Sequence, residues 1–591
     1  MTKRSRSDKL GNQTGAGEAE GDLPLQTLKK VWGYDSFRPG QREAIDSVLS
    51  GRDTVVIFPT GGGKSLCYQL PALLFEGVTL VISPLVALME DQVARLQEQG
   101  VRATYINSTL HPREVEQRLI NARNGMYRLL YLSPERLSTL VWEQSASQIP
   151  VSLVAVDEAH CISEWGHDFR PDYREIRPRI LETVGPVRWL ALTATATPEV
   201  RKDLIESLEL HDPGVITRGF ERPNLQWWVR EVKQKRPELL RAVGRAVRHG
   251  SGLVYAATRK ECERLARLLT TEGVPAEAYH GGLPAPTRLS IQERWTSGEL
   301  PVVVGTNAFG MGIDKADCRF VIHADLPLSL ENYYQEAGRA GRDGEKAWPL
   351  LLVRDGDWER ARSRLDFFWP PFKELETLYD AVCDELELAV GSEQEEPAPV
   401  SLKGLSRRAS RTPSTVQTGL DMLERLGVFS RMQTREPRIG IHFLHSREIL
   451  LELIRRSEDE RGEWLDRLLR LAGSEAMERR VWLSRDRLAD RLQCSSDDLI
   501  RRLEVFALED RILTIHQSDQ DPVLRLELAR QRHLPVDKKQ VEGVRSRLLE
   551  KLRHVKGYLQ TQGCREKYLR YYFGETNATD CGHCDRCLSS S

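Results

Sequence analysis

The amino-acid sequence predicts an α/β protein in which two parallel-sheet lobes precede smaller helical units and a metal-binding module. Short apolar segments alternate with helical segments over residues 24–350, which is the pattern of parallel sheets covered by helices. A glycine-rich segment with the letters TGGGKS follows one predicted strand, and the carboxylates Asp157 and Glu158 follow another. Four of the ten cysteines lie close together near residue 580.

Length and charge bound the organisation of the chain. With 591 residues it is too long for one core, so several domains are expected. The 85 Lys and Arg residues balance the 86 Asp and Glu residues, so any basic surface must be local. Residues 1–22 are predicted as a disordered tail. The lack of a bilayer-spanning run and of a signal-like segment favours the cytoplasm, with nucleoid association if the source is bacterial.

The segment after the predicted strand 54–58 is a candidate phosphate loop. Its glycines allow backbone N–H groups to approach phosphates, and a helix N-terminus adds a positive dipole. Lys64 would reach the β and γ phosphates, and Ser65 would ligate magnesium. Phe58 stands where the strict motif has its first glycine. The assignment as a phosphate loop therefore relies on the predicted strand that precedes it. The predicted nucleotide contacts are Thr60, Gly61, Gly62, Gly63, Lys64 and Ser65.

Two carboxylates follow the apolar strand predicted at residues 151–156. Asp157 is the candidate for holding magnesium through its water shell, and Glu158 for positioning and deprotonating the attacking water. The next residues interleave aromatic and cationic side chains, which can stack bases and hold phosphates. The candidate single-strand contacts are Trp165, His167, Phe169 and Arg170. The alternative is a loop of packed aromatic side chains without a ligand.

Residues 213–350 repeat the α/β rhythm without a second phosphate loop, so the two sheets would share one nucleotide. Arg339 and Arg342 lie in this part of the chain, and an arginine from the facing lobe can neutralise charge on a transferred phosphoryl group. Gln335 is a further candidate nucleotide contact, and with His160 it could link hydrolysis to lobe position. A solvated helix face is the alternative for the arginine pair taken alone.

Residues 351–398 are predicted as a helical linker, and two similar units follow at residues 399–450 and 451–535. Each has a helix, a capped turn, a second helix and a β-rich wing, which is typical of a winged helix-turn-helix. The expected wing pairs are 427–431 with 439–444, and 512–516 with 523–528. Three cations around the first turn are candidate contacts to duplex DNA, namely Arg407, Arg408 and Arg411.

The last part of the chain, residues 536–591, is predicted to bind zinc. Four thiolates in two groups suit a tetrahedral zinc ion. The expected ligands are Cys564, Cys581, Cys584 and Cys587. A redox disulfide and an iron–sulfur cluster are the alternatives, and His583 could replace one thiolate.

The order of the motifs TGGGKS, SPLVALMEDQ, DEAH and LTATA resembles that of superfamily 2 helicases. The segment 37–41 is similar to the adenine-reading motif of the RecQ DNA helicases, and the segment 161–173 to their aromatic-rich loop. The resemblance implies two RecA-like lobes at residues 23–212 and 213–350. It implies ATP, Mg²⁺ and Zn²⁺ as cofactors, DNA as partner, and 3′-to-5′ unwinding in repair and recombination. The site residues that it implies are Phe37, Arg38 and Gln41 for adenine, Arg342 as arginine finger, and Arg339 beside it.

One feature departs from the family pattern. In typical RecQ proteins the zinc module follows the motor directly and one winged helix comes after it, with a further HRDC domain in many relatives. Here residues 351–535 intervene, and no HRDC-like segment is expected. Alternative functions are a DNA-stimulated translocase that does not separate strands, a winged-helix regulator with a degenerate ATPase fold, and an RNA helicase.

Overall fold

The computed structural model describes residues 22–59, 61–84, 86–163, 170–310, 315–432, 437–457, 460–518 and 521–589. The chain forms two compact units, one of which interrupts the other in sequence. We call residues 1–358 and 551–591 the core unit, and residues 359–550 the inserted unit. No helix in the described ranges is both long and apolar enough to cross a membrane.

The first lobe of the core unit is built on a parallel sheet that has seven strands among the described residues, in the order β3-β4-β2-β5-β6-β1-β7. The strands are β1 (Thr54–Ile57), β2 (Val78–Ile82), β3 (Ala103–Ile106), β4 (Leu129–Leu132), β5 (Val151–Val156), β6 (Arg188–Thr193) and β7 (Gly214–Thr217). β1, β2 and β4 are buried along their whole length, which explains their predominantly apolar sequences.

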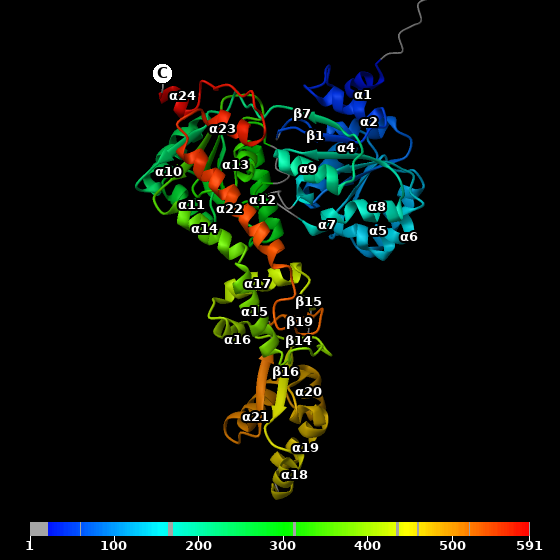
Figure 1. Ribbon diagram of the computed structural model, residues 1–591, viewed down its shortest axis with the longest axis vertical. Coiled ribbons are helices and arrows are strands. Elements are labelled where there is room, and N and C mark those ends of the chain that lie inside the picture. Colours follow the sequence, from blue (N-terminus) through cyan, green and yellow to red (C-terminus); the bar gives the residue numbers. More distant parts are fainter. Residues whose placement is uncertain are drawn as a thin grey trace, which may run out of the picture. The chain divides into compact units, whose positions relative to one another are not determined.

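Helices cover both faces of this sheet (Figure 1). They are α1 (Leu23–Trp32), α2 (Gln41–Leu49), α3 (Leu66–Leu74), α4 (Val86–Glu98), α5 (Pro112–Arg123), α6 (Leu140–Ala146), α7 (Pro171–Arg174), α8 (Ile176–Thr183) and α9 (Pro198–Ser207), with short 3₁₀ turns at Pro134–Ser138 and Ala159–Ile162. Asp22, which the sequence assigns to the tail, caps α1 because its carboxylate accepts a hydrogen bond from the Leu25 N–H.

The second lobe repeats this design with a six-stranded parallel sheet in the described residues, in the order β10-β11-β9-β12-β13-β8. Its strands are β8 (Trp228–Glu231), β9 (Gly252–Tyr255), β10 (Ala276–Tyr279), β11 (Val302–Gly305), β12 (Phe320–His323) and β13 (Trp348–Val353). Its helices are α10 (Lys235–Ala246), α11 (Arg259–Thr271), α12 (Ala285–Ser297) and α13 (Leu330–Ala337), with a 3₁₀ turn at Val247–His249. The two-lobed α/β fold class is thus confirmed.

The C-terminal helices return to the second lobe after the insertion (Figure 1). They are α22 (Lys538–Gln560), α23 (Arg565–Tyr572) and α24 (Asp585–Ser589). Lys551 in α22 forms an ion pair of 2.7 Å with the buried Glu331 of α13, and the hydroxyls of Tyr558 and Tyr333 are 3.5 Å apart. The cysteine-rich module therefore packs directly on the second lobe, although the inserted unit separates them in sequence.

The described residues of the inserted unit form short helices and two small antiparallel sheets. Its helices are α14 (Asp357–Phe368, which begins in the core unit), α15 (Phe372–Glu385), α16 (Leu402–Arg408), α17 (Pro413–Arg425), α18 (Arg447–Arg456), α19 (Glu460–Ala472), α20 (Arg485–Leu492) and α21 (Ser496–Leu508), with a 3₁₀ turn at Ser474–Met477. Its strands are β14 (Ala398–Pro399), β15 (Phe429–Met432), β16 (Arg438–Phe443), β17 (Val481–Ser484), β18 (Leu513–Ser518) and β19 (Val523–Leu526). The two predicted helix-turn-helix pairs correspond to α16 with α17 and to α20 with α21.

The predicted wing pairings are wrong. β15 pairs with β19, so that Phe429 lies opposite Leu526, and β16 pairs with β18, so that Ile441 lies opposite Ile515. Each expected hairpin therefore has its two strands in different sheets. The alternation of apolar residues identifies the buried face of a strand, but it carries no information about the strand's partner.

This pairing places the second helix-turn-helix inside the wing of the first. The first core contains α15, α17, Phe429 and the β19 residues Leu524 and Leu526. The second core contains Ile439, Leu450 and Leu513. The expected boundaries at residues 450 and 535 therefore differ from the structure. α15, expected in a linker, is part of the first core because Leu375, Tyr379 and Val382 are buried in it.

The long-range wing predicts where a cavity mutation acts. Leu524→Ala removes a fully buried side chain from the first core and should destabilise the inserted unit by about 2 to 5 kcal/mol. Amide hydrogen exchange should accelerate in α16 and α17 more than in α20 and α21. Leu528→Ala, at a side chain that is 57% exposed, is the matched control and should change little. Faster exchange confined to α20 and α21 would contradict the observed strand pairing.

Candidate active site and metal centre

The glycine-rich loop connects β1 to α3 in a conformation that needs glycine. Gly61 and Gly63 have φ angles of +82° and +74°, which L-residues rarely adopt. A Cβ atom on Gly63 would also lie only 2.4 Å from Nε2 of Gln41. The Nζ atom of Lys64 donates to the Phe58 carbonyl at 3.3 Å. The glycines therefore keep side chains away from the backbone of the loop, and the Lys64 side chain folds back toward the start of the loop, as in a phosphate-binding loop.

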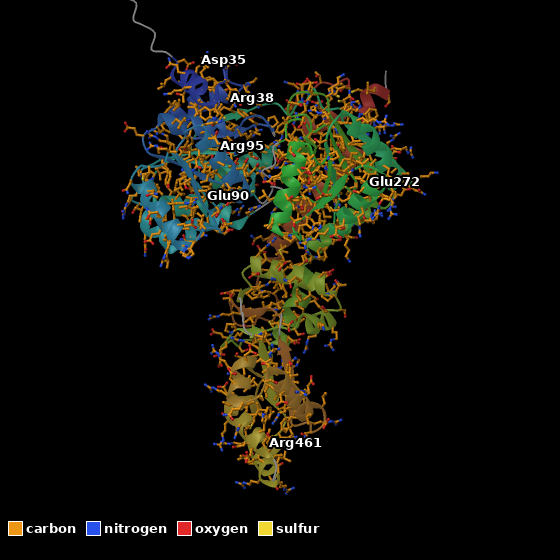
Figure 2. All side chains as sticks on the ribbon, turned by 180° about the vertical axis from the view of Figure 1, so that it is seen from behind. Asp35, Arg38, Glu90, Arg95, Glu272 and Arg461 are labelled. Atoms are coloured by element: carbon orange, nitrogen blue, oxygen red, sulfur yellow. The ribbon has the colours of Figure 1, made fainter. Side chains whose placement is uncertain are left out.

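A cavity of about 350 Å³ lies over this loop and receives residues from both lobes. Its lining residues in the described part of the chain are Trp32, Arg38, Gly61, Gly63, Lys64, Ser65, Gln69, Leu88, Asp91, Gln92, Arg95, Leu96, Gln99, Asp157, Glu158 and Arg342. Arg38 and Arg95, both labelled in Figure 2, contribute positive charge from the first lobe. The cavity thus combines the loop, two carboxylates and several cations.

The two carboxylates stand at the carboxyl end of β5. Asp157 is 7% exposed, and burial together with the neighbouring Glu158 raises its pKa to about 7. Burial lowers the pKa of Lys64. The neighbouring Glu158 and Asp157 carboxylates raise the pKa of Lys64, but their effect is smaller than that of desolvation. Tyr173 of α7 donates its hydroxyl to the Asp157 carbonyl at 3.1 Å and so fixes the backbone. A buried carboxylate and a partly buried one beside a lysine form an arrangement that a divalent cation would stabilise.

Hydrogen bonds connect this pair to the neighbouring strands. Nδ1 of His160 lies 3.2 Å from Oε2 of Glu158 and 3.0 Å from the Thr193 hydroxyl at the end of β6. Ser65 accepts a hydrogen bond of 3.1 Å from Nε2 of Gln92. Sequence reasoning missed Gln92 as a site residue, although it stands in the SPLVALMEDQ motif. Tyr173 belongs to the aromatic-rich segment that the sequence singles out, but its hydrogen bond to the Asp157 carbonyl was not predicted.

The three residues expected to contact adenine have different surroundings. Arg38 lines the cavity and donates to the Gly61 carbonyl at 2.7 Å. Gln41 donates from Nε2 to the Gly63 carbonyl at 3.0 Å and accepts from the Arg38 N–H at 2.8 Å. Phe37 packs against a small cluster that includes Leu28. Gln41 and Phe37 are not among the described residues that line the cavity, and Gln41 supports the loop through its bond to Gly63.

Of the two candidate arginines Arg339 and Arg342, one reaches the cavity. Arg342 lines it, and its Cγ would lie 3.5 Å from a Cβ atom on Gly61. Arg339 is 7% exposed and lies beside Gly310, where a Cβ atom would meet its guanidinium at 2.8 Å. Gln335 is half-buried in α13. Neither Arg339 nor Gln335 is among the described residues that line the cavity.

The candidate DNA contacts are only partly described. Trp165, His167 and Phe169 lie outside the described residues, as does Thr60 of the phosphate loop. Arg170 donates to the Pro84 carbonyl, after β2, at 3.1 Å. In the inserted unit Arg407 is exposed, whereas the other two cations pair with carboxylates of α15. Arg408 lies 3.1 Å from Glu385, and Arg411 lies 2.9 Å from Glu374.

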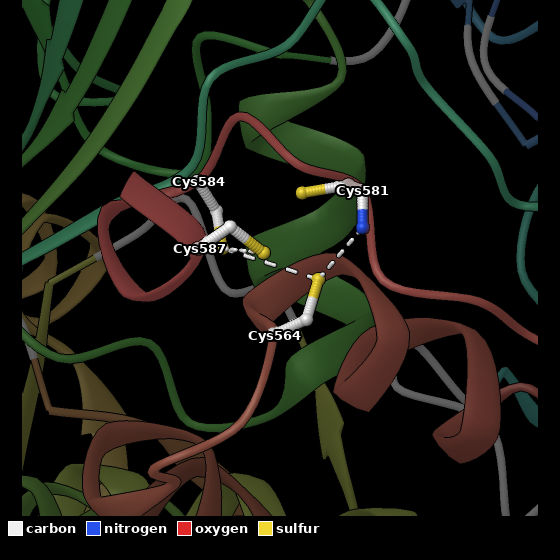
Figure 3. A group of neighbouring side chains, drawn as sticks. All are labelled: Cys564, Cys581, Cys584 and Cys587. Carbon is white, nitrogen blue, oxygen red and sulfur yellow. Dashed lines mark hydrogen bonds between the residues drawn. The ribbon is translucent and has the colours of Figure 1, made fainter. Parts of the chain in front are cut away.

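The four C-terminal cysteines converge on one centre (Figure 3). The Sγ atom of Cys584 lies 3.9 Å from that of Cys564 and 3.6 Å from that of Cys587. All four Sγ atoms lie within 4.8 Å of one another. Zinc–sulfur bonds of about 2.3 Å in a tetrahedron separate the sulfurs by about 3.8 Å, so the four thiols fit a zinc ion. The same distances are far too long for a disulfide, whose S–S bond is about 2.05 Å.

Backbone groups support thiolates at this centre. The N–H of Cys581 donates to Sγ of Cys564 at 3.2 Å, and the N–H of Arg565 donates to Sγ of Cys584 at 3.4 Å. His583 binds elsewhere: its Nδ1 lies 2.6 Å from the Cys581 carbonyl and its Nε2 lies 3.4 Å from Glu566. The four cysteines thus form a complete ligand set, with His583 beside it.

Comparisons with known proteins agree with this geometry. The DEAD/DEAH box helicase family matches residues 38–204, the helicase conserved C-terminal domain matches residues 234–344, and the RecQ zinc-binding family matches residues 526–588. Among solved structures, the Mycobacterium smegmatis helicase Lhr bound to ssDNA and AMP-PNP is 21% identical with a TM-score of 0.47, over 68% of this chain and 57% of that chain.

Two curated relatives come from Bacillus subtilis. ATP-dependent DNA helicase RecQ is 49% identical over 331 residues, which are 56% of this chain and 56% of the relative, so the match spans little more than half the length of either protein. Probable ATP-dependent DNA helicase RecS is 43% identical over 337 residues, which are 56% of this chain and 67% of the relative. Together with the two helicase lobes and the zinc-binding module, these matches show that the chain belongs to the RecQ family of superfamily 2 helicases.

Proposed function

We propose that this protein is an ATP-dependent DNA helicase that moves 3′ to 5′ along one strand and separates the duplex ahead. The observation that carries the proposal is the cavity in which Lys64, the Asp157–Glu158 pair and Arg342 meet. A phosphate loop and a carboxylate pair on one lobe, facing an arginine from the other, form the arrangement that phosphoryl transfer requires. The two relatives named as DNA helicases support DNA as the nucleic acid.

In this proposal each group acts on a different part of ATP. The backbone of residues 60–63 and Lys64 hold the phosphates. Ser65 and Asp157 hold Mg²⁺, which neutralises phosphate charge when it is bound. Glu158 orients the attacking water and accepts its proton, while its contact with His160 holds the carboxylate in place. Arg342 stabilises the charge that develops on the γ-phosphoryl group.

Movement along DNA follows from the division of the site between two lobes. Because Arg342 must approach the phosphate loop for hydrolysis, the gap between the lobes depends on the nucleotide state. We assign the single-strand contact to Trp165, His167, Phe169 and Arg170. Arg170 lies twelve residues after Glu158 in the sequence, so this segment can connect strand binding with hydrolysis. Its anchor at the Pro84 carbonyl supports this role, because Pro84 belongs to the loop that follows β2.

The zinc centre and the inserted unit have separate roles in this proposal. Cys564, Cys581, Cys584 and Cys587 hold a structural zinc ion, which couples metal binding to the folding of the module. The helix-turn-helix of α16 and α17 grips the duplex through Arg407, Arg408 and Arg411. Since two of these arginines already pair with carboxylates of α15, DNA phosphates would have to displace those partners.

The first prediction tests the phosphate loop and the reaction itself. Lys64→Ala should abolish ATP turnover, measured with and without single-stranded DNA, while binding of single-stranded DNA stays within about threefold. Lys202→Ala, an exposed lysine of the same lobe, is the control and should keep full turnover. Normal turnover in Lys64→Ala would refute the site. Comparing RNA with DNA as the stimulating strand tests the RNA alternative.

A strand-displacement assay on a duplex with a 3′ tail distinguishes a helicase from a translocase. The unmutated protein should release the displaced strand with ATP and fail to do so with a non-hydrolysable analogue. Because single-strand contacts alone sustain translocation, DNA-stimulated ATP turnover without strand release would favour the translocase.

The second prediction concerns the duplex grip. Replacing Arg407, Arg408 and Arg411 together by Ala should weaken duplex binding and flatten its salt dependence. The slope of log affinity against log salt should change by up to about 2.7, since each phosphate contact contributes about 0.9. ATP turnover stimulated by single strands should persist while unwinding falls. The control replaces Arg455, Arg456 and Arg470, exposed arginines of the same unit. An unchanged salt slope in the test variant would remove this helix-turn-helix from the proposal.

The third prediction concerns zinc. Changing any one of the four ligand cysteines to Ser should lower both the zinc content per chain and the unfolding temperature, because metal binding and folding are linked. Cys494→Ser, outside the cluster, should keep the zinc content of the unmutated protein. A preparation of the unmutated protein that contains no zinc yet has full stability would contradict the assignment.

A further inference from the structure

The segment that joins the two lobes, residues 218–227, is held by the zinc-binding module. The ring of Phe220 stacks on that of Phe573, with centroids 4.4 Å apart, and the Phe220 N–H donates to the Glu575 carboxylate. Tyr334 of α13 donates its hydroxyl to the Phe220 carbonyl at 2.9 Å. At the far end of the segment, the Asp585 N–H donates to the Trp227 carbonyl at 3.0 Å. The joining segment is therefore fixed along its length rather than left as a free tether.

Arg222 lies in the middle of this segment and is 9% exposed. Its N–H donates to Oε1 of Glu566 in α23 at 2.7 Å. Its guanidinium donates to three carbonyl groups of one turn, those of Gly338 at 3.1 Å, Ala340 at 2.9 Å and Gly341 at 3.5 Å. Burial lowers the pKa of Arg222. A buried guanidinium is retained here because several oriented carbonyl groups replace its water shell.

These carbonyl groups belong to the turn that carries the two candidate site arginines of the second lobe. The turn follows α13 and includes Arg339 and Arg342. Nδ2 of Asn224, also in the joining segment, donates to the Gly341 carbonyl at 2.7 Å and to the Glu345 carbonyl at 2.9 Å. Gly341 has a φ of +59°, and a Cβ atom there would meet Nδ2 of Asn224 at 2.4 Å. The joining segment thus determines the shape of the turn from which Arg342 extends to the phosphate loop.

The contacts form a continuous path from the zinc module to the nucleotide cavity. The Cys564 ligand caps α23, Glu566 of the same helix fixes the backbone of Arg222, and Arg222 fixes the turn that carries Arg342. Arg222 and Glu566 are not among the described residues that line the cavity, and the inference gives them no direct contact with ATP. A lysine at position 222 would carry its three donors on one nitrogen at the end of a flexible stem, so it would lack the two separate guanidinium nitrogens with which Arg222 binds Gly338 and Ala340.

We propose that Arg222 is a positioning residue for the Arg342 finger, and that the zinc module holds it in place through Glu566. This inference rests on the proposed ATP hydrolysis. It gives the module a part in regulating the site, beyond stability, because any rearrangement of α23 relative to the joining segment would displace the finger.

The first experiment follows the turn itself and does not depend on hydrolysis. Arg222→Lys should accelerate amide hydrogen exchange at residues 338–344 while exchange in the phosphate loop stays unchanged. Arg128→Lys is the matched control, since Arg128 donates to the Phe75 carbonyl in the first lobe, away from the cavity. Unchanged exchange at residues 338–344 in Arg222→Lys would overturn the inference, whether or not the protein hydrolyses ATP.

The second experiment asks whether Arg222 acts through Arg342. Arg222→Lys should lower kcat for ATP roughly a hundredfold with KM nearly unchanged, because a displaced finger loses alignment and the binding groups remain. Arg342→Ala should lower kcat by about a thousandfold or more. The double variant should then lie within about threefold of Arg342→Ala alone, since residues that act as a unit are not additive. Multiplying losses in the double variant would overturn the inference. Absence of turnover in the unmutated protein would instead refute the proposed function, leaving the exchange result to decide on Arg222.

The third experiment tests the connection to the zinc module. Glu566→Ala removes the acceptor of the Arg222 N–H and should reproduce the faster exchange at residues 338–344. Glu566→Gln keeps an acceptor oxygen and should exchange at the rate of the unmutated protein. Zinc content, measured in both variants, should stay at the level of the unmutated protein because the four cysteines are intact. Equal exchange in the two variants, at the unmutated rate, would remove Glu566 from the path.

Discussion

The carboxyl edge of the first parallel sheet is the constraint on which the active site depends. β1, β2, β5 and β6 run in one direction, so the loops that follow them lie at the same edge. This places Lys64 after β1, the carboxylates Asp157 and Glu158 after β5, and Thr193 at the end of β6. His160 then bridges Glu158 and Thr193. None of these side chains could be moved to another strand end without losing one of its partners.

Part of this organisation was readable from the sequence, because strand order need not be known to predict that parallel strands share an edge. The phosphate loop, the carboxylate pair and the four cysteines at one centre follow from motif spacing and local chemistry, whereas the choice of Arg342 followed from the resemblance to RecQ helicases. The structure corrects what depends on long-range pairing. The wing strands exchange partners, and α15 is core rather than linker.

The contacts of Arg222 show a second limit of sequence reasoning. A single arginine in the segment between the two lobes belongs to no periodic pattern and to no motif that would indicate its function. Its role depends on three carbonyl groups more than a hundred residues away, and backbone carbonyls are identical in every sequence. The same holds for Tyr173, whose partner is the carbonyl of Asp157. Side chains that bind backbone are therefore the class of site residue that sequence alone reveals least.

The ends of the inserted unit lie side by side. Asp366 and Arg545 form an ion pair of 2.6 Å, Trp369 donates to the Val541 carbonyl at 3.3 Å, and the Phe372 N–H donates to Glu542 at 3.0 Å. The chain thus enters and leaves this unit through one narrow stem closed by α14, α15 and α22. For the remainder of the molecule the insertion is equivalent to a loop whose ends are held together by its own contacts. Even a flexible loop would add only about 0.6 kcal/mol of closure free energy for each doubling of its length. A stem of this kind lets evolution add, exchange or shorten the insertion while the second lobe and the cysteine-rich module keep their mutual packing.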